Sequence, residues 1–72
     1  MSPALPVVGG ADVIVALSKA GFVQVSQRGS HVKLRGGDRT VIVPMHRELA
    51  TGTLRSVLRQ AGLTPAEFFA LL

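Results

Sequence analysis

The chain has 72 residues, enough for one small domain, and 47% of them are hydrophobic, which suffices for a compact core. It has no cysteine, so a disulfide framework and a cysteine-based zinc site are excluded. Its longest apolar runs, 13–17 and 68–72, are far shorter than the ~20 residues of a membrane span, and its N-terminus lacks a signal-peptide pattern. These features predict a soluble, cytoplasmic protein with no membrane association.

Basic residues are concentrated in the segment from Arg28 to Arg59. Seven of the eight Lys and Arg residues lie between Arg28 and Arg59, where only Asp38 and Glu48 offset them. Seven cations less two carboxylates leave +5 in this segment, while the whole chain carries +4. Such a concentration is typical of proteins that bind a polyanion, and a solvated basic face that maintains solubility is the alternative interpretation.

The first 28 residues are expected to form an irregular lead-in, a helix and a strand. Residues 1–9 contain three helix-breaking Pro or Gly residues and are expected to be irregular. Apolar residues then recur at helical spacing over 11–20, and Gly21 supplies a typical helix end. The β-branched and aromatic residues of 22–28 favour a strand.

The middle of the chain predicts a β-hairpin. Residues 30–35 alternate between polar and apolar, as a half-buried strand does. The "GGD" stretch at 36–38 predicts a hairpin turn, and 39–44 predict a third strand that Pro44 closes.

Two helices are expected after the third strand. Apolar residues in 51–62 follow helical spacing, and Gly62 is the expected stop. A further helix is expected from Thr64 to the chain end, because Thr64 can cap it, Pro65 suits its first turn and Glu67 completes a capping box. The sequence therefore predicts one α+β domain over 1–72, ordered α-β-β-β-α with a short extra C-terminal helix. Its three-stranded antiparallel sheet would carry the helices on one face.

The strand over 30–35 presents a histidine beside two cations. Side chains alternate across a strand, and the face that carries Val32 and Leu34 must be buried in so small a domain. Ser30 falls on this inner face, where it would fix the turn rather than act as a nucleophile. The opposite face carries the polar side chains of His31, Lys33 and Arg35.

An exposed imidazole beside cations suits chemistry on a phosphate. The imidazole could take the proton of a ribose 2′-hydroxyl while the cations hold the neighbouring phosphate. A histidine that only contacts a phosphate is the competing interpretation, and a core histidine is a weaker one. His46 and the four carboxylates show no metal-ligand spacing, so no metal site is expected.

Arg55 and Arg59 lie four residues apart on the exposed side of a predicted helix. Like charges at this spacing destabilise an isolated helix, so the pair suits a surface that meets phosphates or an acidic protein, although a solvated face explains it equally well. The chain has no Trp or Tyr, and its three Phe are expected to be buried. Base stacking is therefore nearly absent, and any RNA would be recognised by its backbone and shape.

Three motifs resemble one known family. The "GSH" at 29–31, the "VPMHREL" at 43–49 and above all the "GTLRSVLRQAGL" at 52–63 are similar to the HicA toxins of toxin–antitoxin pairs. The resemblance implies a double-stranded-RNA-binding-domain-like fold and an mRNA interferase, a small endoribonuclease. A base beside phosphate-binding cations requires no metal or other cofactor, so a metal-independent enzyme is expected. It further implies a HicB-like antitoxin that binds the toxin and covers its active site.

The resemblance also assigns residue roles. The family's essential histidine maps onto His31, which would be the general base, and Gly29 and Ser30 map with it. His46 would be either a second proton-transfer group or, as we favour, a structural residue of the loop that enters the next helix. The residues expected to contact RNA are Arg28, Gly29, Ser30, Lys33, Arg35, Arg55 and Arg59.

Two other functional interpretations remain open from the sequence. The first is a non-catalytic RNA-binding module of the double-stranded-RNA-binding type, and the second is an antitoxin-like or regulatory protein-interaction domain. His31 distinguishes the first of these from a nuclease, because a binding module would tolerate its loss.

Overall fold

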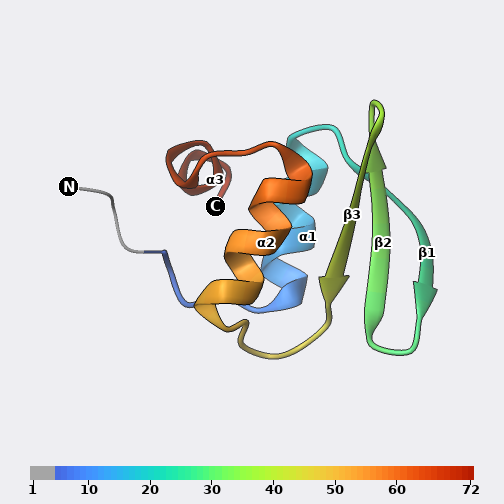
Figure 1. The fold of residues 1–72 in the computed structure, drawn as a ribbon, viewed down its shortest axis with the longest axis horizontal. Coiled ribbons are helices and arrows are strands. Elements are labelled where there is room, and N and C mark those ends of the chain that lie inside the picture. Colours follow the sequence, from blue (N-terminus) through green and yellow to red (C-terminus); the bar gives the residue numbers. More distant parts are fainter. Residues whose placement is uncertain (1–4) are drawn as a thin grey trace.

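The computed structural model describes residues 5–72, which follow the order α-β-β-β-α-α (Figure 1). The elements are α1 (Gly10–Lys19), β1 (Val23–Arg28), β2 (His31–Gly36), β3 (Arg39–Pro44), α2 (Thr51–Ala61) and α3 (Pro65–Leu71). The predicted elements are thus confirmed to within one or two residues at each end. Residues 5–9 form no helix or strand, and residues 1–4 of the expected lead-in lie outside the described residues.

The strands form one antiparallel sheet in the order β1-β2-β3, and the helices cover one of its faces (Figure 1). The core lies between this face and the helices. The sheet contributes the four fully buried side chains Val32, Leu34, Val41 and Val43. The helices contribute, among others, Val13, Leu17, Leu54, Val57 and Phe68. This architecture confirms the α+β fold that the sequence pattern predicts and the double-stranded-RNA-binding-domain-like form that the resemblance implies.

β1 lies at the sheet edge farthest from the helices (Figure 1), and each of its residues is exposed. The pairing with β2 is regular from Arg28 back to Ser26 and is then interrupted by a bulge between Gln24 and Ser26. Of the segment 22–28, only Phe22 is buried. β1 therefore supports β2 through strand pairing and adds almost nothing to the hydrophobic core.

The N-terminus of α1 packs against the loop that follows β3. Gly10 N–H donates to the His46 carbonyl at 2.9 Å, and Leu49 N–H donates to the Val8 carbonyl at 2.8 Å. A Cβ atom on Gly10 would overlap the Pro44 carbonyl oxygen. Glycine is therefore needed at this position because two backbone segments approach each other too closely for a side chain.

The cap of α3 is formed as predicted. Thr64 Oγ1 accepts from Glu67 N–H at 3.1 Å, and the Glu67 carboxylate accepts from Thr64 N–H at 2.8 Å. The hydrogen bond from the Thr64 backbone, with that of its side chain, lowers the pKa of Glu67 below its ordinary value of 4.5.

Among residues 5–72, no helix is long and apolar enough to cross a bilayer.

Candidate functional site

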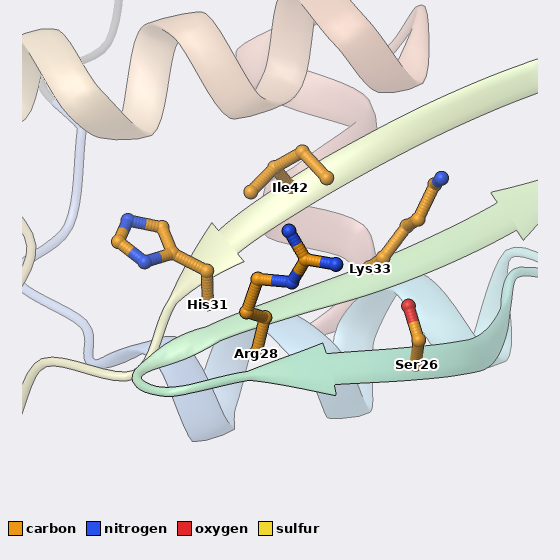
Figure 2. Close-up of a pocket in the computed structure, with 5 residues that line it drawn as sticks. All are labelled: Ser26, Arg28, His31, Lys33 and Ile42. Carbon is orange, nitrogen blue, oxygen red and sulfur yellow. The ribbon is translucent and has the colours of Figure 1, made fainter.

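The face of the sheet that the helices leave open has a shallow depression of about 330 Å³. Its lining residues are Ser26, Arg28, His31, Lys33 and Ile42. Figure 2 shows that all three strands contribute to it and that the five side chains lie on the same side of the sheet. The depression is thus a product of strand pairing alone.

Hairpin register explains why these residues meet. The Gly29-Ser30 turn sets Arg28 directly opposite His31, and two positions further on Ser26 lies opposite Lys33. The second hairpin sets Ile42 opposite Lys33 from the other side. Directly opposite residues have Cβ atoms about 4.5–5.5 Å apart, so Lys33 lies between a hydroxyl and an aliphatic side chain.

The turn that precedes His31 is fixed on two sides. The Gln27 side-chain amide donates to the Gly29 carbonyl at 3.0 Å, and Met45 N–H donates to the Ser30 carbonyl at 2.6 Å. Gly29 has φ +59°, a left-handed conformation that favours glycine. His31 therefore starts β2 from a turn that is tied to β1 and to the end of β3.

The prediction that Ser30 points into the core was wrong. Ser30 belongs to the turn rather than to β2, and it is exposed. The strict alternation used for the prediction starts only at His31, the first residue of β2. From there it is confirmed, because His31, Lys33 and Arg35 are exposed whereas Val32 and Leu34 are buried.

The depression is positively charged and its polar side chains are unengaged. Within the described chain, the side chains of Arg28, His31 and Lys33 form no hydrogen bond to protein atoms. None of the carboxylates in the described part of the chain lines the depression. Cationic donors without a protein partner, gathered on a surface, form a site for an anion.

The other predicted site residues lie outside the depression. Arg35 extends the same row of β2 beyond Lys33, and Arg55 and Arg59 are exposed on α2. His46 is exposed in the loop after β3, where its backbone carbonyl holds Gly10. Of the residues singled out in the sequence, the structure therefore brings together Arg28, His31 and Lys33.

Sequence reasoning missed Ser26 and Ile42. Counting pairs outward from the two hairpin turns would have placed both on the face of His31, but it requires the turn residues to be known.

The expectation that all three Phe are buried was wrong for one of them: Phe22 and Phe68 are buried, whereas Phe69 is only partly so. Across residues 5–72, no three His, Asp or Glu side chains gather as metal ligands would.

A three-stranded sheet with helices on one face and an open cationic depression around an exposed histidine on the other defines a small α+β domain with a basic open face. A family described as "HicA toxin of bacterial toxin-antitoxin" matches residues 10–63, from the start of α1 to just beyond α2. The chain belongs to the HicA family of toxins of bacterial toxin–antitoxin systems. Comparison with curated proteins gives no match. The matched segment contains the complete lining of the depression.

Proposed function

We propose that this toxin is an mRNA interferase, a metal-independent endoribonuclease that uses His31 as its general base. The observation that carries the proposal is the position of His31. It is exposed, its side chain has no hydrogen-bond partner among residues 5–72, and it lies directly opposite Arg28 in a depression whose other polar residues are Lys33 and Ser26. A base beside two cations suits cleavage of RNA by its own 2′-hydroxyl.

The proposed reaction is a transesterification at phosphorus. The His31 imidazole takes the proton of a ribose 2′-hydroxyl, and the resulting oxygen attacks the adjacent 3′-phosphorus. The phosphorus–5′-oxygen bond breaks, which leaves a 2′,3′-cyclic phosphate and a 5′-oxygen that receives a proton from solvent. Arg28 and Lys33 stabilise the charge that develops on the phosphoryl oxygens. Positioned base catalysis of this kind contributes typically ~10²–10⁴ in rate.

The remaining basic residues extend the contact with the RNA backbone. Arg35 continues the cationic row of β2, and Arg55 and Arg59 would meet phosphates farther along the strand or an acidic protein. Gly29 and Ser30 hold the turn that presents His31. His46 lies outside the depression, so we assign it to the loop that enters α2 rather than to proton transfer.

A HicB-like antitoxin is the proposed partner, with the toxin acting on mRNA in the cytoplasm. The depression is open and carries no carboxylate, so an antitoxin with an acidic surface could cover it and neutralise its charge. Covering the depression would block RNA and explain inhibition without any change in the toxin's fold.

The test is induced expression of wild type, His31→Ala and His46→Ala in a host without an antitoxin. Growth and the integrity of one mRNA are followed together. His46→Ala is the matched control, because it removes an exposed histidine outside the depression. Growth arrest with fragmented mRNA for wild type and His46→Ala, but not for His31→Ala, supports the proposal. Equal effects of all three proteins would contradict it and favour a non-catalytic RNA-binding module.

A further inference from the structure

Ile42 is the only apolar residue among the five that line the depression, and its side chain is 38% exposed. The core does not need it, because its neighbours Val41 and Val43 are fully buried and make the contribution of β3. Strand propensity does not require it either, because a β-branched polar residue serves equally well, as Thr40 does in the same strand. The phosphate chemistry proposed above leaves Ile42 without a role.

Ile42 lies next to the proposed base. His31 is paired with Pro44, and Ile42 precedes Pro44 by two residues, so Ile42 and His31 are diagonal neighbours on one face of the sheet. Such neighbours are about 7–8 Å apart, within reach of a single bound nucleotide. Figure 2 shows both side chains on the face that also presents Arg28.

The position of Ile42 is fixed before any ligand arrives. Its strand is paired with β2 on one edge, and on the other its backbone N–H donates to Gln60 Oε1 of α2 at 2.8 Å. A wall held in place in this way loses little conformational freedom when a ligand packs against it.

On the basis of the proposed function, we propose that Ile42 contacts the nucleobase of the nucleotide whose 2′-hydroxyl faces His31. An aliphatic side chain recognises the apolar face that every base has and carries no hydrogen-bonding code. The aromatic residues do not compete for this role, since none of the Phe residues, all of which lie within 5–72, lines the depression. Ile42 thus positions one nucleotide of any base, and Arg28 and Lys33 hold its phosphate.

The test uses a dinucleoside monophosphate with 2′-deoxyribose in its 5′ nucleoside. Its single phosphate fixes one binding register, and the missing 2′-hydroxyl prevents cleavage by the proposed chemistry. A second ligand has hydrogen in place of the base of that 5′ nucleoside. Dissociation constants are measured by NMR titration, and the amide signals of Arg28, His31 and Lys33 report whether the depression is occupied.

Four proteins are compared, namely wild type, Ile42→Thr, Ile42→Val and Val23→Thr. Val23→Thr is the matched control, because it makes an exposed β-branched residue of the same sheet polar outside the depression. Removal of the base should weaken binding to wild type about three- to tenfold, as expected for loss of a small apolar contact. Ile42→Thr should bind the complete ligand more weakly by a similar factor and show no further loss when the base is removed. Ile42→Val should lie between them, and Val23→Thr should behave as wild type.

The outcomes separate this inference from the proposed function. An equal loss on base removal in wild type and Ile42→Thr would overturn the contact between Ile42 and the base, while binding at Arg28 and Lys33 would leave the His31 proposal standing. If neither ligand perturbs the signals of the depression in wild type, the proposed function fails at its first step, and the role of Ile42 fails with it.

Discussion

Gln60 Oε1 accepts a hydrogen bond from the backbone N–H of Ile42 at 2.8 Å. This contact joins α2 to the edge of β3 that is not paired with β2. The backbone carbonyl of Gln60 also accepts from the Arg39 guanidinium at 3.3 Å. The two contacts bind one helical residue to two positions of the same strand. The helix thereby occupies the edge at which another strand would otherwise pair.

Replacing Gln60 tests this contact. Gln60→Leu removes the acceptor and should lower the free energy of unfolding by about 0.5–1.5 kcal/mol, the net value of one hydrogen bond. Gln60→Glu keeps an acceptor at the same reach and should retain most of the stability. Urea denaturation at neutral pH measures both. Equal stability of Gln60→Leu and wild type would show that water replaces the amide at no cost.

Replacing glycine by alanine should have opposite effects on stability at Gly10 and at Gly52. In Gly10→Ala the new methyl group overlaps the Pro44 carbonyl oxygen, so two backbone segments must separate, and we expect a loss of about 1–3 kcal/mol. In Gly52→Ala, on the first turn of α2, the methyl group meets nothing within 4 Å. Alanine should then stabilise the helix by about 0.5–1 kcal/mol. Thermal unfolding of the two variants gives the comparison, and a stabilised Gly10→Ala would contradict the close approach.

The α3 cap predicts an acid-sensitive contribution to stability. Its hydrogen bonds lower the pKa of Glu67 in the folded protein, so ionised Glu67 stabilises the fold above its unfolded pKa, and this stabilisation disappears as the pH falls through the folded pKa. The stability difference between wild type and Glu67→Gln should be constant near neutrality and shrink below pH 4.5. Denaturation curves between about pH 2 and about pH 7, where Glu67 passes from protonated to ionised, measure this stability difference.

Thr64→Ala removes the other half of the cap. Loss of the Thr64 hydroxyl leaves Glu67 N–H without its acceptor and should cost about 1 kcal/mol at neutral pH. Ser should rescue most of the loss, because it restores the hydroxyl. An equal loss for Thr64→Ser and Thr64→Ala would place the effect in the methyl group instead.

Arg28 and Arg35 differ in what they should contribute to RNA binding. Arg28 lines the depression and Arg35 does not, although both lie on the open face of the sheet. The affinity for RNA falls as salt rises. Arg28→Gln should make the slope of log affinity against log salt shallower by about 0.7 for a single-stranded RNA, because one phosphate contact is lost. It should also slow cleavage. Arg35→Gln should reduce the slope without slowing cleavage of bound RNA. Equal cleavage rates at saturating RNA for the two variants would contradict a special role for Arg28.

The sequence predicts the fold well because its signals are local. The alternation around Val32 and Leu34 separates the buried from the open face of β2, and the Thr64 cap marks the start of α3. The exposure of β1 could not be predicted in this way. Val23 and Val25 have the composition of a buried strand, yet they are 64% and 51% exposed. Val23 lies opposite Arg35 on the open face of the sheet, and Val25 falls in the bulge, which the sequence does not reveal.

The site is predicted less completely because pairing joins residues that are distant in sequence. His31, Lys33 and Arg28 follow from charge and alternation, and the HicA resemblance adds emphasis to His31. Ile42 in β3 reads simply as one apolar residue among others, and its place in the depression depends on the register of two hairpins. The Gln60–Ile42 contact spans 18 residues and leaves no periodic trace in the sequence.

The bulge in β1 has a consequence for how the chain behaves when concentrated. The edge of β3 is occupied by α2, whereas β1 presents its backbone and two exposed valines to solvent. Such an edge invites strand-to-strand polymerisation. The bulge between Gln24 and Ser26 breaks the regular spacing of donors and acceptors that a growing fibril would copy, and Arg28 places a positive charge at the end of the same strand. The bulge in β1 thus protects the sheet, one face of which is not covered by helices, against strand-to-strand polymerisation.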